Sequence, residues 1–291
     1  MLEIKDDSNC ILIAPQHGAR ILRWQRDGRE IITWPDAADW SQILKVRGGN
    51  PILFPFVARH FLEGKSELWR DESGLVRPMP RHGFARDAKF TVIDDGEANS
   101  FRMRLTDSAQ TKAEYPFAFQ FDVVVTLQPG SRLEVRFETT NRGDQPLPYY
   151  AGHHFYLAIP HGERGDWKLD LPCASWGTQA ADGAILHQKP ESDDLRLDDP
   201  RLIDRFQIKP RTNQVLLVNS RTQQRLVFDL SEPGSAPWYA VTTWTESASS
   251  DFYCIEPWLG LPNAIHHREG LRQIAAGETE VARCILDASA W

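Results

Sequence analysis

Residues 119–137 read FQFDVVVTLQPGSRLEVRF, and this stretch decides the fold class. Every second residue from Phe119 to Leu127 is apolar, and so is every second residue from Leu133 to Phe137. Because side chains along a strand alternate between two faces, this pattern predicts two strands that each bury one face. The segment 129–131, Pro-Gly-Ser, lies between the two runs and has the composition of a turn. The stretch therefore predicts a long antiparallel hairpin.

Strand-like patterns continue along the rest of the chain. They cover residues 101–105, 215–218, 226–228, 239–244, 251–256 and 281–286. The 291 residues include 19 Gly and 19 Pro, so a chain breaker falls about once in eight residues, which leaves little room for long helices. We therefore predict an all-β fold with one domain over residues 1–291. An antiparallel sandwich of two large sheets fits, and its long strands would leave a concave face.

Composition and charge limit the classes of partner. The net charge of -7 argues against nucleic acid, since binding to a phosphate backbone needs a basic surface. The first residues have neither a basic segment nor an apolar one that would form a signal peptide, and no run approaches the roughly 20 apolar residues of a membrane helix. The four cysteines are scattered in apolar surroundings without a CxxC pair, which indicates reduced thiols. We expect a cytoplasmic protein, monomeric or dimeric, with no membrane or nucleic-acid partner.

A candidate site begins with the glutamate in residues 254–263, CIEPWLGLPN. Glu256 follows an apolar run, and an unpaired buried carboxylate costs several kcal/mol. Such a residue is either paired with a cation for structural reasons or kept for chemistry with a shifted pKa. Trp258 favours the second interpretation, because an indole stacks on the apolar face of a sugar ring, and Asn263 adds an amide for hydroxyl groups. The stretch suggests acid–base work on a carbohydrate.

Histidines are the candidate partners of this glutamate. His82 lies in a charged turn, and His153 and His154 follow a glycine. Neighbouring residues of a strand face opposite ways, so only one histidine of the pair can face a pocket, and alternation alone leaves either possible. A histidine among aromatic residues is also common as a packed core residue. A metal site needs two or three further ligands on one face, so we expect no metal.

Four segments in order resemble the aldose 1-epimerase superfamily, the galactose mutarotase-like proteins. They are residues 49–56 (GNPILFPF), 82–86 (HGFAR), 151–156 (AGHHFY) and 254–258 (CIEPW), and the closing 274–279 (IAAGET) is similar to the family's lead into its last strand. The similarity spans nearly the whole chain. It implies an antiparallel supersandwich with a sugar cleft on its concave face.

The resemblance also implies roles for residues. Glu256 resembles the general base and His153 the general acid, because the family pattern is His-x-aromatic-aromatic, while His82 resembles a second histidine that hydrogen-bonds the sugar. Arg59 and Arg86 match cleft arginines of the branches whose motif reads HGFAR, and Asp204 matches a sugar-binding aspartate. The predicted substrate-binding set is thus Arg59, Arg86, His154, Asp204, Trp258 and Asn263.

The activity that these roles imply is a cofactor-independent mutarotase, which interconverts the anomers of a monosaccharide or sugar phosphate by acid–base ring opening. Arg59, Arg81 and Arg86 could hold a phosphate in bidentate fashion, although arginine also binds neutral hydroxyls. Two alternatives stay open. One is a non-catalytic carbohydrate-binding or regulatory protein on the same fold. The other is a lyase or glycosidase, although a glycosidase usually needs two carboxylates at one bond.

Overall fold

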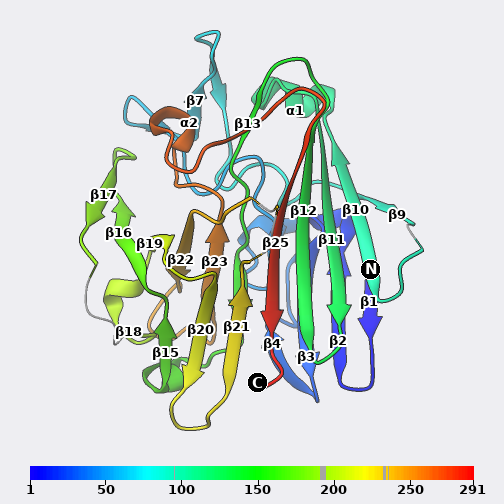
Figure 1. Ribbon diagram of the computed structural model, residues 1–291, viewed down its shortest axis with the longest axis vertical. Coiled ribbons are helices and arrows are strands. Elements are labelled where there is room, and N and C mark those ends of the chain that lie inside the picture. The colour runs from blue at the N-terminus through cyan, green and yellow to red at the C-terminus, as the bar shows by residue number, and fades with distance from the viewer. Residues whose placement is uncertain (95, 191–194, 232–233, 235) are drawn as a thin grey trace.

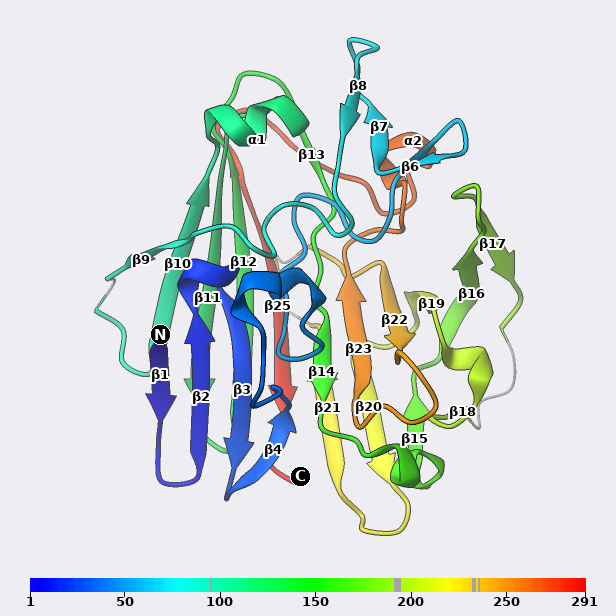
Figure 2. The ribbon, with the colours of Figure 1, turned by 180° about the vertical axis from the view of Figure 1, so that it is seen from behind.

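Two large antiparallel sheets lie against each other in the computed structural model, which describes residues 1–94, 96–190, 195–231, 234 and 236–291. Within these residues one sheet has nine strands and faces the viewer in Figure 1, and the other has ten strands and faces the viewer in Figure 2. The predicted antiparallel sandwich is confirmed. The sequence pattern predicted individual strands, and the structure adds which distant strands pair with one another.

The ten-stranded sheet runs, in spatial order, through β1 (Leu2–Lys5), β2 (Asn9–Ala14), β3 (Arg20–Arg26), β4 (Arg29–Ile32), β14 (Phe155–Leu157), β23 (Tyr253–Trp258), β22 (Ala240–Trp244), β19 (Arg205–Pro210), β16 (Cys173–Gln179) and β17 (Ile185–Gln188). The nine-stranded sheet runs through β18 (Leu195–Arg196), β15 (Trp167–Asp170), β20 (Gln214–Asn219), β21 (Arg225–Asp229), β25 (Thr279–Asp287), β12 (Arg132–Asn141), β11 (Phe119–Gln128), β10 (Ser100–Thr106) and β9 (Thr91–Ile93).

The remaining elements are short. Small two-stranded sheets pair β5 (Phe61–Leu62) with β6 (Lys65–Ser66), β7 (Leu68–Arg70) with β8 (Val76–Pro78), and β13 (Leu147–Tyr149) with β24 (Arg272–Ile274). The helices are α1 (Ala109–Glu114), α2 (Ala264–His267) and the 3₁₀ segments η1 (Pro15–His17), η2 (Trp40–Lys45), η3 (His161–Asp166) and η4 (Pro200–Leu202). None of the helices in the described ranges is both long and apolar enough to cross a membrane.

The hairpin predicted from the alternating pattern is formed by β11 and β12. Leu127 pairs with Leu133 and Val125 with Val135, and these four side chains are buried. One predicted strand is displaced, because residues 251–256 were expected and β23 runs from Tyr253 to Trp258. The strand therefore continues through Glu256 and Pro257 instead of ending there, and Glu256 lies within the sheet.

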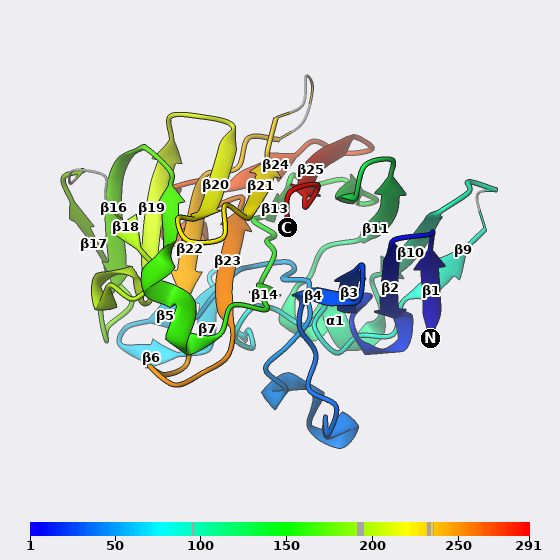
Figure 3. The same cartoon turned by 90° about the horizontal axis from the view of Figure 1, so that it is seen from below.

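The core lies between the two sheets, which Figure 3 shows as separate layers, with β20, β21 and β25 in one and β14, β22 and β23 in the other. The inner face of β14 presents Phe155, which contacts Phe228 of β21 with ring centroids 5.6 Å apart. Burying one large apolar side chain contributes about 1.5–3 kcal/mol, so this packing fixes which face of β14 points inward. The other face of β14 is left to form the site.

Candidate active site

The floor of a cavity is formed by the outer face of the ten-stranded sheet. Residues directly opposite each other in an antiparallel pair share a face, and Thr242 of β22 lies opposite Glu256 of β23 and also opposite Phe206 of β19. These three side chains therefore stand in one row. The cavity has a volume of about 280 Å³ and is lined by Arg20, Leu44, Val46, Arg47, Pro51, Ala58, Arg59, Arg81, His82, Arg86, His154, Tyr156, Gln179, Asp204, Phe206, Thr242, Trp244, Glu256 and Trp258.

Two loops over the sheet form the walls, and they hold each other in place. The backbone N–H of Ala58 donates to His82 Nδ1 (3.0 Å), and the N–H of His82 donates to the carbonyl of Ala58 (2.8 Å). Gly83 adopts a φ of 72°, and a Cβ atom there would lie 2.1 Å from the carbonyl oxygen of Phe54. Only glycine allows this approach, so the HGFAR segment is locked against the segment around residue 54.

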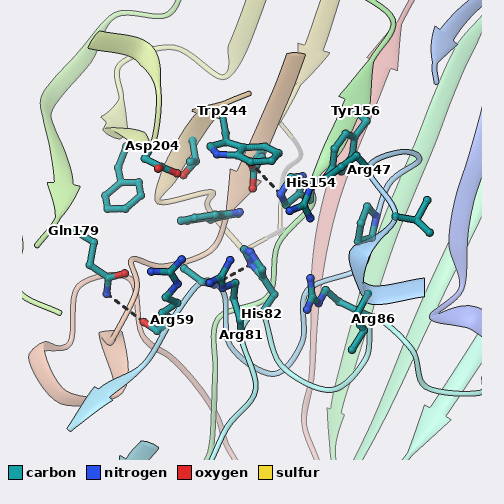
Figure 4. A pocket seen from close by; sticks show the side chains of 18 of the residues that line it. Arg47, Arg59, Arg81, His82, Arg86, His154, Tyr156, Gln179, Asp204 and Trp244 are labelled. Carbon is teal, nitrogen blue, oxygen red and sulfur yellow. Dashed lines mark hydrogen bonds and ion pairs between the residues drawn. The ribbon is translucent and has the colours of Figure 1, made fainter. Parts of the chain in front are cut away.

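Of the two adjacent histidines, His154 is the one that lines the cavity (Figure 4). Phe155 pairs with Ile255, so the next step of the same register places His154 opposite Glu256 on the outer face. The distance between His154 Nε2 and Glu256 Oε1 is 3.5 Å. The sheet thus brings an imidazole and a carboxyl together from positions about a hundred residues apart in the chain.

The expectation that His153 faces the cleft is wrong. Its side chain is 0% exposed and lies between the sheets, with ring centroids 4.4 Å from Phe137 and 5.3 Å from Trp238. Its Nδ1 is 3.1 Å from the side-chain nitrogen of Asn50, whose oxygen accepts the N–H of His154. His153 is therefore a packed core residue, and the parity of the strand gives the cleft to its neighbour.

Aromatic rings fix the position of the His154 imidazole. It stacks on Tyr156 at 4.7 Å between centroids and meets Trp244 and His82 edge to face at 5.6 Å and 5.5 Å. A ring held on three sides loses little further entropy when it engages a substrate.

Gly152 makes room for another wall of the site. A Cβ atom on Gly152 would lie 2.5 Å from Trp258 Cδ1, so glycine allows the indole to lie across the backbone before His153. The indole N–H donates to the carbonyl of His153 (3.2 Å). Trp258 lines the cavity.

Burial shifts the pKa values of the central pair in opposite directions. Burial raises the pKa of Glu256 well above its ordinary value, and the nearby Asp204 raises it further. Burial lowers the pKa of His154 well below its ordinary value, and the charges of Arg86 and Arg20 lower it further. Burial therefore favours the neutral forms of both groups, which hold one exchangeable proton between them.

His82 has its tautomer set by the wall contact. Its Nδ1 accepts the N–H of Ala58, so the neutral ring carries its proton on Nε2. Burial, followed by the charge of Arg86, lowers the pKa of His82 well below its ordinary value. The ring is thus a neutral N–H donor at the wall of the cavity.

The other predicted binding residues divide into two groups. Arg59, Arg86 and Asp204 line the cavity. Asn263 does not. Its side-chain oxygen accepts the N–H of Phe61 (2.8 Å) and its nitrogen donates to the carbonyl of Phe61 (3.2 Å), so its amide is used to pin β5. The prediction that Asn263 contacts the sugar is wrong on this geometry.

Several lining residues carried no recognised signal in the sequence. Tyr156 and Trp244 share the outer face with Glu256 and follow from strand parity once the register is known. Arg20 is a strand residue that segment 40–46 covers, and Arg47 lies in a loop. No local sequence pattern identifies either arginine as part of a site. Their place in the site depends on long-range folding.

One cluster of possible metal ligands occurs within the described ranges. Donor atoms of His154, Cys254 and Glu256 lie within 4.8 Å of one another. Cys254 pairs with Tyr156 across β14 and β23, is fully buried and is absent from the cavity lining, and burial raises the pKa of its thiol well above its ordinary value. A protonated thiol is a poor ligand, so the cluster is better described as an imidazole–carboxyl pair with a buried cysteine beside it.

The fold and the site define a galactose mutarotase-like protein. The family model described as aldose 1-epimerase matches residues 1–285, and the chain therefore belongs to the aldose 1-epimerase family. A curated relative is the chromosomal protein LacX of Lactococcus lactis subsp. lactis, which is 25% identical over an alignment of 290 positions, with 91% of this chain and 89% of the relative covered.

Solved structures show the same fold. The Slr1438 protein from Synechocystis has a TM-score of 0.84 at 22% identity, with 100% of this chain and 96% of that chain covered. A galactose mutarotase related enzyme from Lactobacillus acidophilus has a TM-score of 0.81 at 24% identity, with 98% and 96% covered. A galactose mutarotase-like protein from Lactobacillus casei has a TM-score of 0.80 at 20% identity, with 99% of each chain covered.

Proposed function

We propose that the protein is a mutarotase that interconverts the α and β anomers of an aldohexose, free or phosphorylated, by ring opening between Glu256 and His154. The observation that carries this proposal is the 3.5 Å contact of His154 Nε2 with Glu256 Oε1 at the floor of the cavity. The two oxygens that exchange protons in ring opening, the ring oxygen and the anomeric hydroxyl, are bonded to the same carbon. An acid and a base this close can serve both oxygens of one sugar.

The reaction takes two proton transfers in each direction. Glu256 accepts the proton of the anomeric hydroxyl while His154 donates a proton to the ring oxygen, and the bond between C1 and the ring oxygen breaks to give the open-chain aldehyde. Rotation about C1–C2 exposes the other face of the carbonyl. Closure reverses both transfers, so the pair regains its starting protonation. Each positioned proton transfer typically contributes about 10²–10⁴-fold.

The pair starts with the right number of protons. The neutral pair and the ion pair differ only in the position of one proton, and burial favours the neutral pair. Hydrogen bonds from sugar hydroxyls to the carboxylate favour the charged pair once substrate is bound. His82, with its proton on Nε2, donates to a sugar oxygen and needs no titration of its own.

The size of the cavity favours one monosaccharide. Ligand sites generally range over about 300–1,000 Å³, and the volume here, about 280 Å³, lies just below that range. Trp258 offers an apolar surface for a ring face, and Asp204, Gln179 and Thr242 offer acceptors and donors for hydroxyls. No cofactor enters any step.

Exchange spectroscopy by NMR tests the proposal, because it measures anomer interconversion at equilibrium. The protein is expected to speed exchange of glucose, galactose or glucose 6-phosphate anomers above the spontaneous rate, and Glu256→Gln is expected to reduce this acceleration about 10²–10⁴-fold. Calorimetry then decides between a catalyst and a binding protein. Sugar binding without faster anomer exchange would reject the mutarotase and leave a carbohydrate-binding protein.

A further inference from the structure

The chain that leads into β14 pairs, on the side away from β23, with a segment that begins at Gly49. Leu53 and Gly152 exchange two backbone hydrogen bonds of 2.9 Å each, and the N–H of Tyr156 donates to the carbonyl of Gly49 (2.9 Å). In an antiparallel ladder such hydrogen-bonded pairs recur at every second residue. One further pair is therefore expected midway between these two.

This middle pair is irregular. It joins Pro51 to His154, and proline has no N–H to donate, so the pair cannot form both of its hydrogen bonds. The N–H of His154 donates instead to the side-chain oxygen of Asn50 (2.9 Å). Asn50 is itself fixed, because it is 0% exposed and its backbone N–H donates to the carbonyl of Ile21 in β3 (2.7 Å). A side-chain amide thus replaces a peptide group beside the histidine that lines the cavity.

The same side chain holds the other histidine. The oxygen of Asn50 accepts an N–H, so its nitrogen is the donor toward His153 Nδ1 at 3.1 Å, and the neutral ring of His153 carries its proton on Nε2. The ring of His153 stacks on Phe155 between the sheets, with centroids 4.8 Å apart. Asn50 therefore holds one histidine by its ring, which points inward, and the next by its backbone, so that the second ring points outward.

The proposed reaction depends on the position of this backbone. His154 Nε2 lies 3.5 Å from Glu256 Oε1, and Glu256 is held within β23 by its pairing with β22. The three-residue strand β14 begins only at Phe155, so His154 lies just before the regular pairing. A displacement of about 1 Å at a reacting group can cost about 100-fold in rate. The hydrogen bond from His154 to Asn50 restrains the chain at this point.

We propose that Asn50 is a positioning residue of the reaction, an inference that rests on the proposed function. Its amide bridges the two histidines and holds the imidazole of His154 at the distance from Glu256 that proton transfer needs. Asn50 is absent from the cavity lining, so it acts through the backbone of His154 and not on the sugar. Loss of the bridge is expected to lower kcat while KM changes little.

Two variants of similar size separate the bridge from the volume of the side chain. In Asn50→Leu the side chain neither accepts the N–H of His154 nor donates to His153. Asn50→Asp keeps an oxygen for the N–H of His154, and its second oxygen accepts from His153 once that ring carries its proton on Nδ1. We expect kcat for anomer exchange to fall about 10- to 100-fold in Asn50→Leu and to recover most of this loss in Asn50→Asp.

Asn141→Leu is the matched control for stability. Asn141 is 1% exposed at the end of β12, donates to the carbonyls of Gln145 and Ile274 (both 2.8 Å) and accepts the N–H of Gly143 (2.9 Å). Both Asn→Leu variants lose buried hydrogen bonds and are expected to lose several degrees in Tm. At a temperature where both are folded, only Asn50→Leu is expected to lose kcat.

Either of two results would overturn the proposal. One is a folded Asn50→Leu protein with the kcat of wild type, and the other is an equal loss of kcat in Asn50→Leu and Asn141→Leu. If Asn50→Leu does not fold, Asn50→Ser replaces it. The serine hydroxyl is too short to bridge both histidines, so the same fall in kcat is expected, and wild-type kcat in that variant would overturn the proposal equally.

A crystal structure of Asn50→Leu or Asn50→Ser keeps this inference apart from the proposed function. The distance between His154 Nε2 and Glu256 Oε1 is expected to lengthen by about 1 Å. A longer distance in the variant together with no anomer exchange by wild type supports the positioning by Asn50 and rejects the mutarotase. Anomer exchange by wild type together with unchanged kcat and distance in the variant supports the mutarotase and rejects the positioning.

Discussion

Replacing one histidine of the adjacent pair tests the geometry most directly. His154→Gln keeps an N–H group near the position of the ring Nε2, which lies 3.5 Å from Glu256 Oε1, but an amide cannot exchange a proton at neutral pH. A positioned proton transfer contributes about 10²–10⁴-fold, which corresponds to about 3–5 kcal/mol in the activation free energy. We expect kcat for anomer exchange to fall by that factor while sugar binding changes little.

His153→Asn is the matched control. The asparagine oxygen takes the place of ring Nδ1, so the contact with Asn50 Nδ2 is kept and the backbone of His154 stays anchored. The loss of ring contacts with Phe137 and Trp238 leaves a void in the core. We expect a loss of about 2 kcal/mol in the free energy of unfolding, and hence a fall of about 4–8 °C in Tm, with kcat within a few-fold of wild type.

The assay is NMR exchange between anomers at equilibrium, with the spontaneous rate subtracted, alongside thermal unfolding of each variant. The reasoning predicts that activity and stability separate, with His154→Gln slow and folded and His153→Asn fast and less stable. A His154→Gln protein as fast as wild type, or a folded His153→Asn protein as slow as His154→Gln, would refute the assignment.

Three further outcomes follow from the site. Glu256→Gln is expected to lose about 10²–10⁴-fold in kcat. Because burial raises the pKa of Glu256 in the folded protein, wild type loses stability as pH rises above the ordinary value of 4.5, whereas the variant does not. The Tm of the variant minus the Tm of wild type should therefore increase with pH, and a constant difference would contradict the raised pKa. Asn263→Gly preserves the left-handed backbone (φ 66°) but removes both hydrogen bonds to Phe61, so Tm should fall by a few degrees with kcat unchanged. A change in KM without a change in Tm would instead indicate that Asn263 contacts the sugar. Dialysis against EDTA should leave anomer exchange at its original rate, because the proposed transfers use side chains alone, and a loss restored by added metal would show otherwise.

Local patterns predicted much of this fold. The alternation in β11 and β12 predicts both strands, and the turn residues between them predict their antiparallel register. Glu256 could be recognised as a candidate because a carboxylate within an apolar run is costly to bury unless it is paired or functional. These features depend on residues close together in the chain, where periodicity is informative.

The choice between His153 and His154 could not be made from local pattern. It depends on which face of β14 packs on Phe228 and on the pairing of Phe155 with Ile255, a contact between residues about a hundred positions apart. A shift of one residue in that register exchanges the two faces. The family pattern favoured His153, whereas the pairing of β14 with β23 places His154 opposite Glu256.

Asn263 and Arg20 show a second limit. An amide near a tryptophan suits a sugar, yet the left-handed backbone at Asn263 turns its side chain to Phe61. Arg20 occupies a strand position where an arginine would ordinarily reach solvent, and it is buried only because residues of segment 40–46 cover it. In both cases the partner comes from a distant segment.

The site is divided between sheet and loops, and under the proposed function this division separates proton transfer from the choice of sugar. His154 and Glu256 are placed by the backbone pairing of β14 with β23, so their separation is set by hydrogen-bonded strands. Arg47, Arg59 and Arg86 come from the loops of the walls, which tolerate substitution better than paired strands. Exchanges in those loops should therefore alter which sugars bind, while proton transfer at the anomeric centre persists.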